Sequence, residues 1–289
     1  MCLVVMTVSR YAYGSIVLIS VLLLGSFTFG CQPSSGVSMS RSYTATDFFQ
    51  GPQLAMAEAI ERNDMEALRQ GAEHGIDLHA RGDKQITLMW FALLQENTDA
   101  IRTLVELGVH PNESPVEGGG TPLGQALRKP GTEYLNAMLD GGLSPNDSAG
   151  NDGSDTGYPL IFRAITSGTL EHIKLLVEHG VDIHYRLDDG KGSNPFDIST
   201  TGTKPEIAMY LLEQGADPHI HLSTGVTTAW GVHLKIRDLQ PGPMRDQFIQ
   251  LRDMMIERGV EFPPPSPIEV REQMRAEGLT PVVPSGLER

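Results

Sequence analysis

Residues 159–185, PLIFRAITSGTLEHIKLLVEHGVDIHY, contain the pattern that decides the fold. Apolar residues at helical spacing mark two short helices, one on either side of Ser167-Gly168. They are Ile161, Ala164 and Ile165 in the first helix and Ile173, Leu176 and Val177 in the second. Gly180 then supplies a residue that readily adopts the left-handed conformation with which helices commonly end. We therefore predict a helix, a tight turn, a second helix and an extended exit at residues 181–184.

The same pattern occurs five times along the chain. In each unit an apolar residue, here called the opener, begins the first helix, and a closing glycine ends the second helix 19 positions later. The pairs are Met56 and Gly75, Met89 and Gly108, Leu123 and Gly142, Ile161 and Gly180, and Phe196 and Gly215. A small residue follows each opener after three positions and lets neighbouring helices approach closely: Ala59, Ala92, Ala126, Ala164 and Ser199. Because one short helix pair cannot bury its apolar face alone, the repetition predicts a stack of such pairs. A sixth, degenerate unit begins near Thr227 and closes at Gly259.

This period and pattern resemble the ankyrin repeat, through Thr121-Pro122-Leu123 before the first helix and Gly215-Ala216-Asp217 after the second. The resemblance implies an all-α repeat solenoid over residues 53–262, an ankyrin-like stack of about six helix-turn-helix units with short β-hairpin connections. The histidine that usually follows the opener is absent. Ala57, Trp90, Gly124, Phe162 and Asp197 stand in its place. This departure concerns how the turn is braced and leaves the helix pairs intact.

The first thirty residues are typical of a targeting segment. Arg10 is their one charged residue, and an apolar run at residues 15–29 ends in front of Cys31. The segment resembles a bacterial lipoprotein signal with Cys31 as the lipidated residue. A plainly cleaved secretory signal and an uncleaved membrane anchor are the alternatives. Gln32 favours the outer membrane, because aspartate at that position commonly signals retention in the inner membrane. We accordingly predict a periplasm-facing protein of the bacterial envelope, joined to the membrane through an N-terminal lipid.

Two segments flank the predicted repeats. Residues 31–52 are rich in Ser, Gly and Thr and are predicted to form a flexible tether, and residues 263–289 a C-terminal tail with a short helix near 268–277. If Cys31 is lipidated after cleavage, no second cysteine remains for a disulfide, since the other cysteine, Cys2, lies in the signal.

Motifs for catalysis or metal binding are missing from the sequence, including HExxH, paired CxxC, a phosphate-binding loop and GxSxG. His79, His184 and His219 each lie four residues after a closing glycine, where other units have asparagine, which favours a role in bracing the hairpin over a metal site. His219 and His221 could face one side of an extended segment, but two ligands are too few for a structural zinc site. The Asp- and Gly-rich residues 146–157 lack the ligand pattern of an EF-hand and favour a solvated loop over a calcium site. We predict neither an enzyme nor a bound cofactor or metal.

The formal net charge of −14 argues against nucleic acid and against broad binding to anionic lipid. It favours a basic protein partner, although acidity that serves only solubility is the alternative. Ankyrin-like stacks place hairpin tips and first-helix faces along one concave surface that commonly binds another protein. The candidate protein-binding residues there are Arg81, Asp83, Trp90, Gln95, Glu113, Glu117, Arg128, Thr166, Tyr185 and Asp188. Trp90 could be an interface anchor or could pack between repeats.

Three functions are consistent with these features. The first is a non-catalytic protein-binding lipoprotein, in its sharpest form an immunity protein that binds and blocks an antibacterial effector such as a phospholipase. The second is an envelope scaffold or stress-protection factor. The third, an enzyme built on the stack, is the least favoured.

Overall fold

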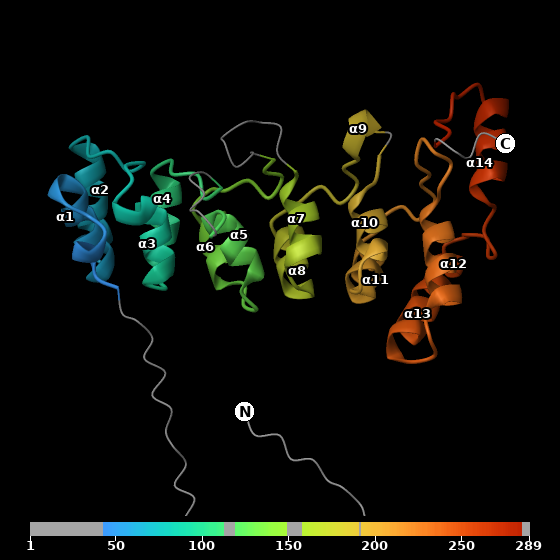
Figure 1. The fold of residues 1–289 in the computed structure, drawn as a ribbon, viewed down its shortest axis with the longest axis horizontal. Helices are drawn as coiled ribbons and strands as arrows, with labels where there is room; N and C mark the ends of the chain where they lie inside the picture. Colours follow the sequence, from blue (N-terminus) through green and yellow to red (C-terminus); the bar gives the residue numbers. More distant parts are fainter. Residues whose placement is uncertain (1–42, 113–118, 149–157, 191, 285–289) are drawn as a thin grey trace, which may run out of the picture. The chain divides into compact units, whose positions relative to one another are not determined.

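The structure, a computed structural model, describes residues 43–112, 119–148, 158–190 and 192–284. In these residues the helices follow one another in pairs (Figure 1). Six pairs follow one another: α1 (Gly51–Glu61) with α2 (Met65–Glu73), α3 (Leu88–Leu94) with α4 (Thr98–Glu106), α5 (Pro122–Arg128) with α6 (Glu133–Asp140), α7 (Leu160–Ser167) with α8 (Leu170–Glu178), α10 (Pro195–Thr201) with α11 (Pro205–Glu213), and α12 (Thr228–Asp238) with α13 (Pro243–Glu257). Outside the pairs are the 3-10 helices η1 (Ala45–Asp47) and η2 (Asp83–Gln85), the short α9 (Leu187–Gly190) and α14 (Pro267–Ala276).

The pairs stack in chain order. Each first helix contacts the first helix of the next unit, from α1 with α3 through to α10 with α12. Among the second helices, α2 contacts α4, α4 contacts α6, α8 contacts α11 and α11 contacts α13. All five openers and the four alanines three positions after an opener are buried in one continuous hydrophobic core, and Ser199 is buried as well. The prediction of a repeat solenoid is confirmed.

The closing glycines have the predicted backbone conformation. Their φ angles are positive, for example +82° at Gly180 and +96° at Gly215, and the same holds at Gly259 in the sixth unit. The residue after each glycine donates its N–H to a carbonyl in the last turn of the helix, as Val181 does to Leu176 at 3.0 Å. This pairing satisfies a carbonyl that the end of the helix would otherwise leave free.

The first helices α3, α5 and α10 begin at polar N-cap residues. The hydroxyl of Thr87 accepts the N–H of Trp90 at 3.3 Å, and the hydroxyl of Thr121 accepts the N–H of Gly124 at 3.1 Å. Asn194 does the same through its side-chain oxygen for the N–H of Asp197 at 2.8 Å. The threonine of the Thr-Pro-Leu motif therefore acts as an N-cap, which satisfies a free N–H of the first turn.

The ends of several first helices are tied to the following unit. Side chains of that unit donate to carbonyls at or just beyond the C-terminal end of the preceding first helix. These bonds are Asn97 Nδ2 to Ile60 O at 2.8 Å, His172 Nε2 to Ala126 O at 3.3 Å, Lys204 Nζ to Gly168 O at 2.5 Å and Lys235 Nζ to Gly202 O at 3.4 Å. Adjacent units are thus joined by hydrogen bonds as well as by apolar contact.

The connections between units turn back as hairpins, but the described residues form no sheet. Single backbone bonds close the turns, such as Gly82 N–H to Ile86 O at 2.8 Å, and His221 and Thr227 form an isolated antiparallel bridge. The expected β-hairpins are therefore hairpin-shaped loops without strands in this part of the chain.

The predicted tether needs correction, whereas a helix is present where the sequence predicts one in the C-terminal tail. The sequence predicts a tether at residues 31–52, yet Ala45, Phe48 and Phe49 are buried and α1 begins at Gly51. Within the predicted tail, residues 263–289, α14 lies where the sequence predicts a short helix near 268–277, and its Met274 is buried. Terminal aromatic and apolar residues without repeat spacing gain their contacts only from the folded stack. Residues 1–42, with the predicted signal and Cys31, lie outside the described residues. Among the described helices, none is both long enough and apolar enough to cross a membrane.

Candidate protein-binding surface

A row of equivalent positions along the first helices defines the candidate surface. These positions lie two residues after each opener and are occupied by Glu58, Phe91, Gln125, Arg163 and Ile198. We call the side of the stack that bears them the first-helix surface. Four of the five side chains are partly exposed, whereas Phe91 is fully buried.

The N-terminal segment, residues 43–49, buries Phe91. The rings of Phe48 and Phe49 lie edge-on to Phe91, with centroids 6.1 and 5.6 Å away. Gln95 Nε2 donates to Tyr43 O at 2.7 Å, and Asp83 N–H donates to Phe48 O at 2.7 Å. Gln95, predicted to meet a partner, therefore holds the chain's own N-terminal segment against the second unit.

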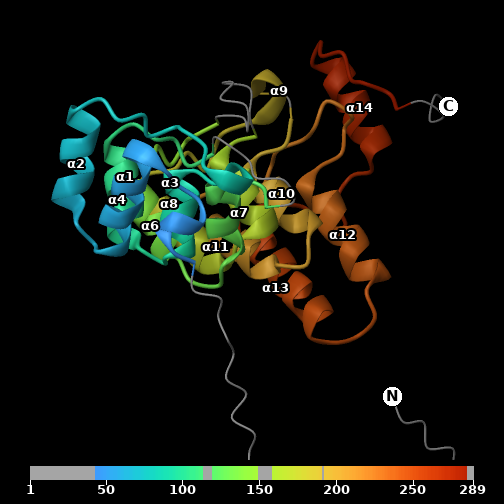
Figure 2. The same cartoon turned by 60° about the vertical axis from the view of Figure 1, so that its left-hand side comes forward.

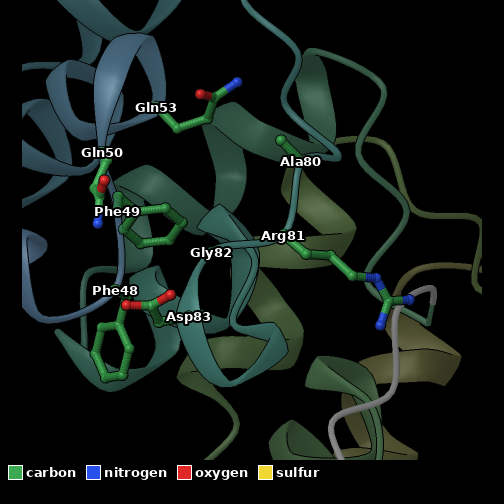
Figure 3. A pocket seen from close by; sticks show the side chains of 8 residues that line it. All are labelled: Phe48, Phe49, Gln50, Gln53, Ala80, Arg81, Gly82 and Asp83. Carbon is green, nitrogen blue, oxygen red and sulfur yellow. The ribbon is translucent and has the colours of Figure 1, made fainter.

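A pocket of about 310 Å³ lies where this segment meets the first hairpin (Figure 3). Two predicted residues, Arg81 and Asp83, line it together with Phe48 and Phe49. In Figure 3 the Arg81 side chain extends away from the two rings, and it donates to Gln85 Oε1 at 3.3 Å. The sequence analysis did not predict a role for Phe48 and Phe49. Two adjacent aromatic residues in an otherwise polar stretch were the signal that could have identified them.

Trp90 packs inside the stack. Its side chain is 8% exposed, as expected within α3, where Leu88 to Leu93 are all buried. The indole N–H of Trp90 is buried and meets no acceptor in the described part of the chain. Of the two roles considered for Trp90, packing between repeats is the one observed, and its place among exposed candidates was wrong.

In the central units, three of the residues predicted to bind a partner are exposed. Arg128, Thr166 and Tyr185 are all exposed. The Thr166 hydroxyl donates to carbonyls of its own helix, Phe162 O at 3.1 Å and Arg163 O at 3.0 Å, so its outward contribution is mainly the methyl group. Glu113 and Glu117 lie outside the described residues. Asp188 lies in α9, but the structure does not describe its side chain.

An aromatic strip flanks the central units. Buried Phe162 lies between Tyr158 and Tyr185, with ring centroids 5.2 and 6.2 Å away. The two tyrosines are 43% and 45% exposed. Burial of part of the ring raises the pKa of the Tyr158 hydroxyl, which keeps it a neutral donor. Tyr158 was not predicted, because it precedes the repeat pattern of its unit.

A polar network next to this strip joins two hairpins to helix α7. Asn112 Oδ1 accepts from Arg163 and from the hydroxyl of Thr121, the latter at 3.0 Å. His110 accepts the Asn112 N–H through Nδ1 and contacts Asp147 Oδ1 through Nε2 at 3.0 Å. Burial lowers the pKa of the Arg163 guanidinium, and nearby Asp147 opposes that shift. The network braces hairpins, the role expected for Asn112.

Of the three histidines that lie four residues after a closing glycine, His219 braces the following unit through its side chain. His219 Nε2 contacts Arg258 O of the following unit at 3.0 Å. Asn146, at the equivalent position, accepts the N–H of Asp182 at 2.7 Å. Among the described residues no group of three or more His, Cys, Asp or Glu side chains is arranged to hold a metal ion.

The helix pairs, their closing glycines and their order define the described residues as an ankyrin-repeat fold. No protein-family model matches the chain. Solved ankyrin repeat domains superpose on it at low identity. That of Bcl-3 has a TM-score of 0.53 and 18% identity and covers 75% of this chain and 92% of that one. An ankyrin repeat domain from Acinetobacter baumannii AYE has a TM-score of 0.50 and 17% identity and covers 72% of this chain and 100% of that one.

Among curated proteins, protein PhlB of Serratia liquefaciens is 29% identical over 146 residues, which are 50% of this chain and 61% of PhlB. Human protein phosphatase 1 regulatory subunit 27 is 44% identical over 62 residues, 22% of this chain and 39% of that protein. The chain thus spans less than two thirds of the length of each.

Proposed function

We propose that this chain is a non-catalytic protein-binding protein whose partner docks on the central units through the exposed side chains of Arg128, Tyr158 and Tyr185. The observation that carries the proposal is the difference in exposure between the second unit and the central units. The N-terminal segment covers Phe91 in the second unit, whereas Arg128, Tyr158 and Tyr185 stand exposed beyond it. Exposed tyrosine and arginine are the residue types that most often anchor protein interfaces. The ankyrin-repeat fold supports the same reading, as does the name of the human relative, a regulatory subunit of a phosphatase.

The finer form of the proposal is an exported immunity protein, anchored through Cys31 in the envelope and facing the periplasm, that blocks an antibacterial effector such as a phospholipase. It is supported by the signal-like residues 1–30 and by the lack of catalytic motifs in the sequence. A protein that acts by occlusion needs a rigid surface and no chemistry of its own.

The charges of the second helices support a basic partner. In all five clear units an acidic residue lies within the first two residues of the second helix and another is its last residue. They are Glu66 and Glu73, Asp99 and Glu106, Glu133 and Asp140, Glu171 and Glu178, and Glu206 and Glu213. Two rows of acidic side chains therefore run along the stack. Such a field accelerates the encounter with a positively charged protein and weakens as salt rises.

The test is co-expression with the product of the neighbouring gene, followed by co-purification and a growth assay. The full chain is expected to bind that product and to neutralise its toxicity. Tyr185→Asp is expected to weaken binding at least tenfold. Ile256→Asp, which changes an equally exposed apolar residue on α13, is the matched control and should bind normally. Failure to bind or neutralise removes the immunity role, and crosslinking to a resident envelope protein instead would favour the scaffold alternative.

The anchor is tested separately. Cys31→Ser is expected to move the chain from the membrane fraction to the soluble periplasmic fraction and to abolish incorporation of a labelled fatty acid. Unchanged fractionation and labelling would remove the lipoprotein assignment without affecting protein binding.

A further inference from the structure

A second pocket, of about 420 Å³, lies at the C-terminal end of the stack. Its walls come from the hairpin between α8 and α10, from the hairpin between α11 and α12, and from α14 with the residues that follow it. Both α9 and α14 lie on the hairpin edge of the row in two views (Figures 1 and 2). We call this the C-terminal pocket.

The rim of the C-terminal pocket is apolar and held in place. Met274 is buried in its wall, while Leu279 and Val282 are 47% and 55% exposed. Val282 N–H donates to Ser223 O at 2.8 Å, which fixes the segment after α14 to the hairpin between α11 and α12. Arg271 Nη1 donates to Thr224 O at 2.9 Å and fixes α14 itself. Two exposed aliphatic side chains are thus presented at one opening on a backbone that is tied down.

Arg186 supplies a positive charge in the same pocket. Its guanidinium donates from Nε to Gly192 O at 3.0 Å and from Nη2 to His221 O at 2.8 Å, so it joins the two hairpins. A guanidinium has further N–H donors beyond these two. Across the described ranges no carboxylate forms an ion pair with Arg186, although the chain as a whole has a net charge of −14.

We propose that the C-terminal pocket binds a protein segment in which an apolar side chain lies next to a carboxylate. The apolar side chain would pack on Leu279 and Val282, and the carboxylate would accept charge-assisted hydrogen bonds from Arg186. The volume is within the range of pockets that enclose small groups. This inference rests on the proposed function as a protein-binding chain and adds a second contact, distinct from the aromatic strip. A partner with a basic surface overall can carry such an acidic, apolar segment locally.

The experiment uses synthetic peptides as the probe. An array of acetylated octapeptides presents Leu or Phe beside Asp, Asn or Lys, and binding to the full chain is measured by fluorescence polarisation. Peptides with Asp are expected to bind at least tenfold more tightly than their Asn counterparts, and peptides with Lys more weakly still. Arg186→Gln is expected to remove the preference for Asp over Asn.

Arg186 also joins two hairpins, so a second variant keeps the test independent of folding. Val282→Asp is expected to weaken the apolar–Asp peptides at least tenfold. Ile268→Asp is the matched control, because Ile268 is 54% exposed on α14 and lies outside the pocket lining. Absence of binding by any peptide, equal binding of Asp and Asn peptides, or equal effects of Val282→Asp and Ile268→Asp would overturn the inference. If the co-purified partner binds wild type and Val282→Asp equally, the proposed function stands and this inference does not.

Discussion

Replacing Gly180 with alanine isolates the conformational role of a closing glycine. Gly180 has φ +82°, and a Cβ added there would meet no atom within 4 Å. The substitution therefore brings no clash, and its effect on the folded state comes from forcing an L-residue into the left-handed region. That region is unfavourable for a residue with a Cβ by about 1–2 kcal/mol. The free energy of unfolding should fall by that amount.

The matched control is Gly202→Ala. A Cβ added at Gly202 would also lie in open space, but the φ angle there is −85°, which alanine adopts without strain. Both substitutions restrict the unfolded chain alike, so their difference reports the backbone conformation alone. Gly202→Ala should leave stability unchanged or raise it by about 0.4–1 kcal/mol.

Urea unfolding followed by circular dichroism measures the difference. With a denaturant slope of about 2 kcal/mol per molar, Gly180→Ala should lower the midpoint by about 0.5–1 M. Equal midpoints for the two variants would refute the argument that the closing glycine is required for its conformation. The same loss is expected at Gly108 and Gly215, which share the positive φ and the open surroundings.

Three further predictions concern single residues. Phe49→Ala should lower the free energy of unfolding by about 3 kcal/mol in the same urea titration. This value is at the low end of the range for replacing a buried phenylalanine by alanine, because the substitution releases only a terminal segment. As a control, Ile268→Ala should lower the free energy of unfolding by less than about 0.5 kcal/mol. Burial lowers the pKa of His172, so its neutral form stabilises the fold above the unfolded-state pKa of about 6.5, and this contribution is lost as the pH falls below that value. The drop in thermal midpoint between pH 7 and pH 5 should therefore be smaller in His172→Gln than in wild type, and an equal drop would contradict the assignment. Gly231→Ala fills open space inside α12 and should raise stability by about 0.5–1 kcal/mol in calorimetry, while a loss would show that the glycine is needed there.

The repeat units were predictable because their signals are local. A glycine that ends a helix, such as Gly180, and a threonine that caps one, such as Thr121, act within a few residues of their own position. Their fixed spacing then implied the stack, since each unit needs a neighbour to cover its apolar face.

The candidate site was harder to predict, because exposure depends on contacts between distant segments. Gln95 was expected to face a partner but binds Tyr43, 52 positions away in the chain. Trp90 and Phe162 occupy the same position of their units, yet neither is available to a partner, and the exposed rings are Tyr158 and Tyr185 beside the repeat pattern. The pocket beside α14 likewise depends on a segment without repeat spacing.

The bonds from Asn97, His172, Lys204 and Lys235 to the preceding first helix make the units interdependent. When one unit opens, the helix end before it loses such a hydrogen bond, so disorder in one unit weakens the unit that precedes it. Truncation between two units is therefore expected to destabilise the unit before the cut, and chains shortened from the C-terminal side should melt at progressively lower temperatures. We therefore expect the units to unfold cooperatively, because the stability of each unit depends on the unit that follows it.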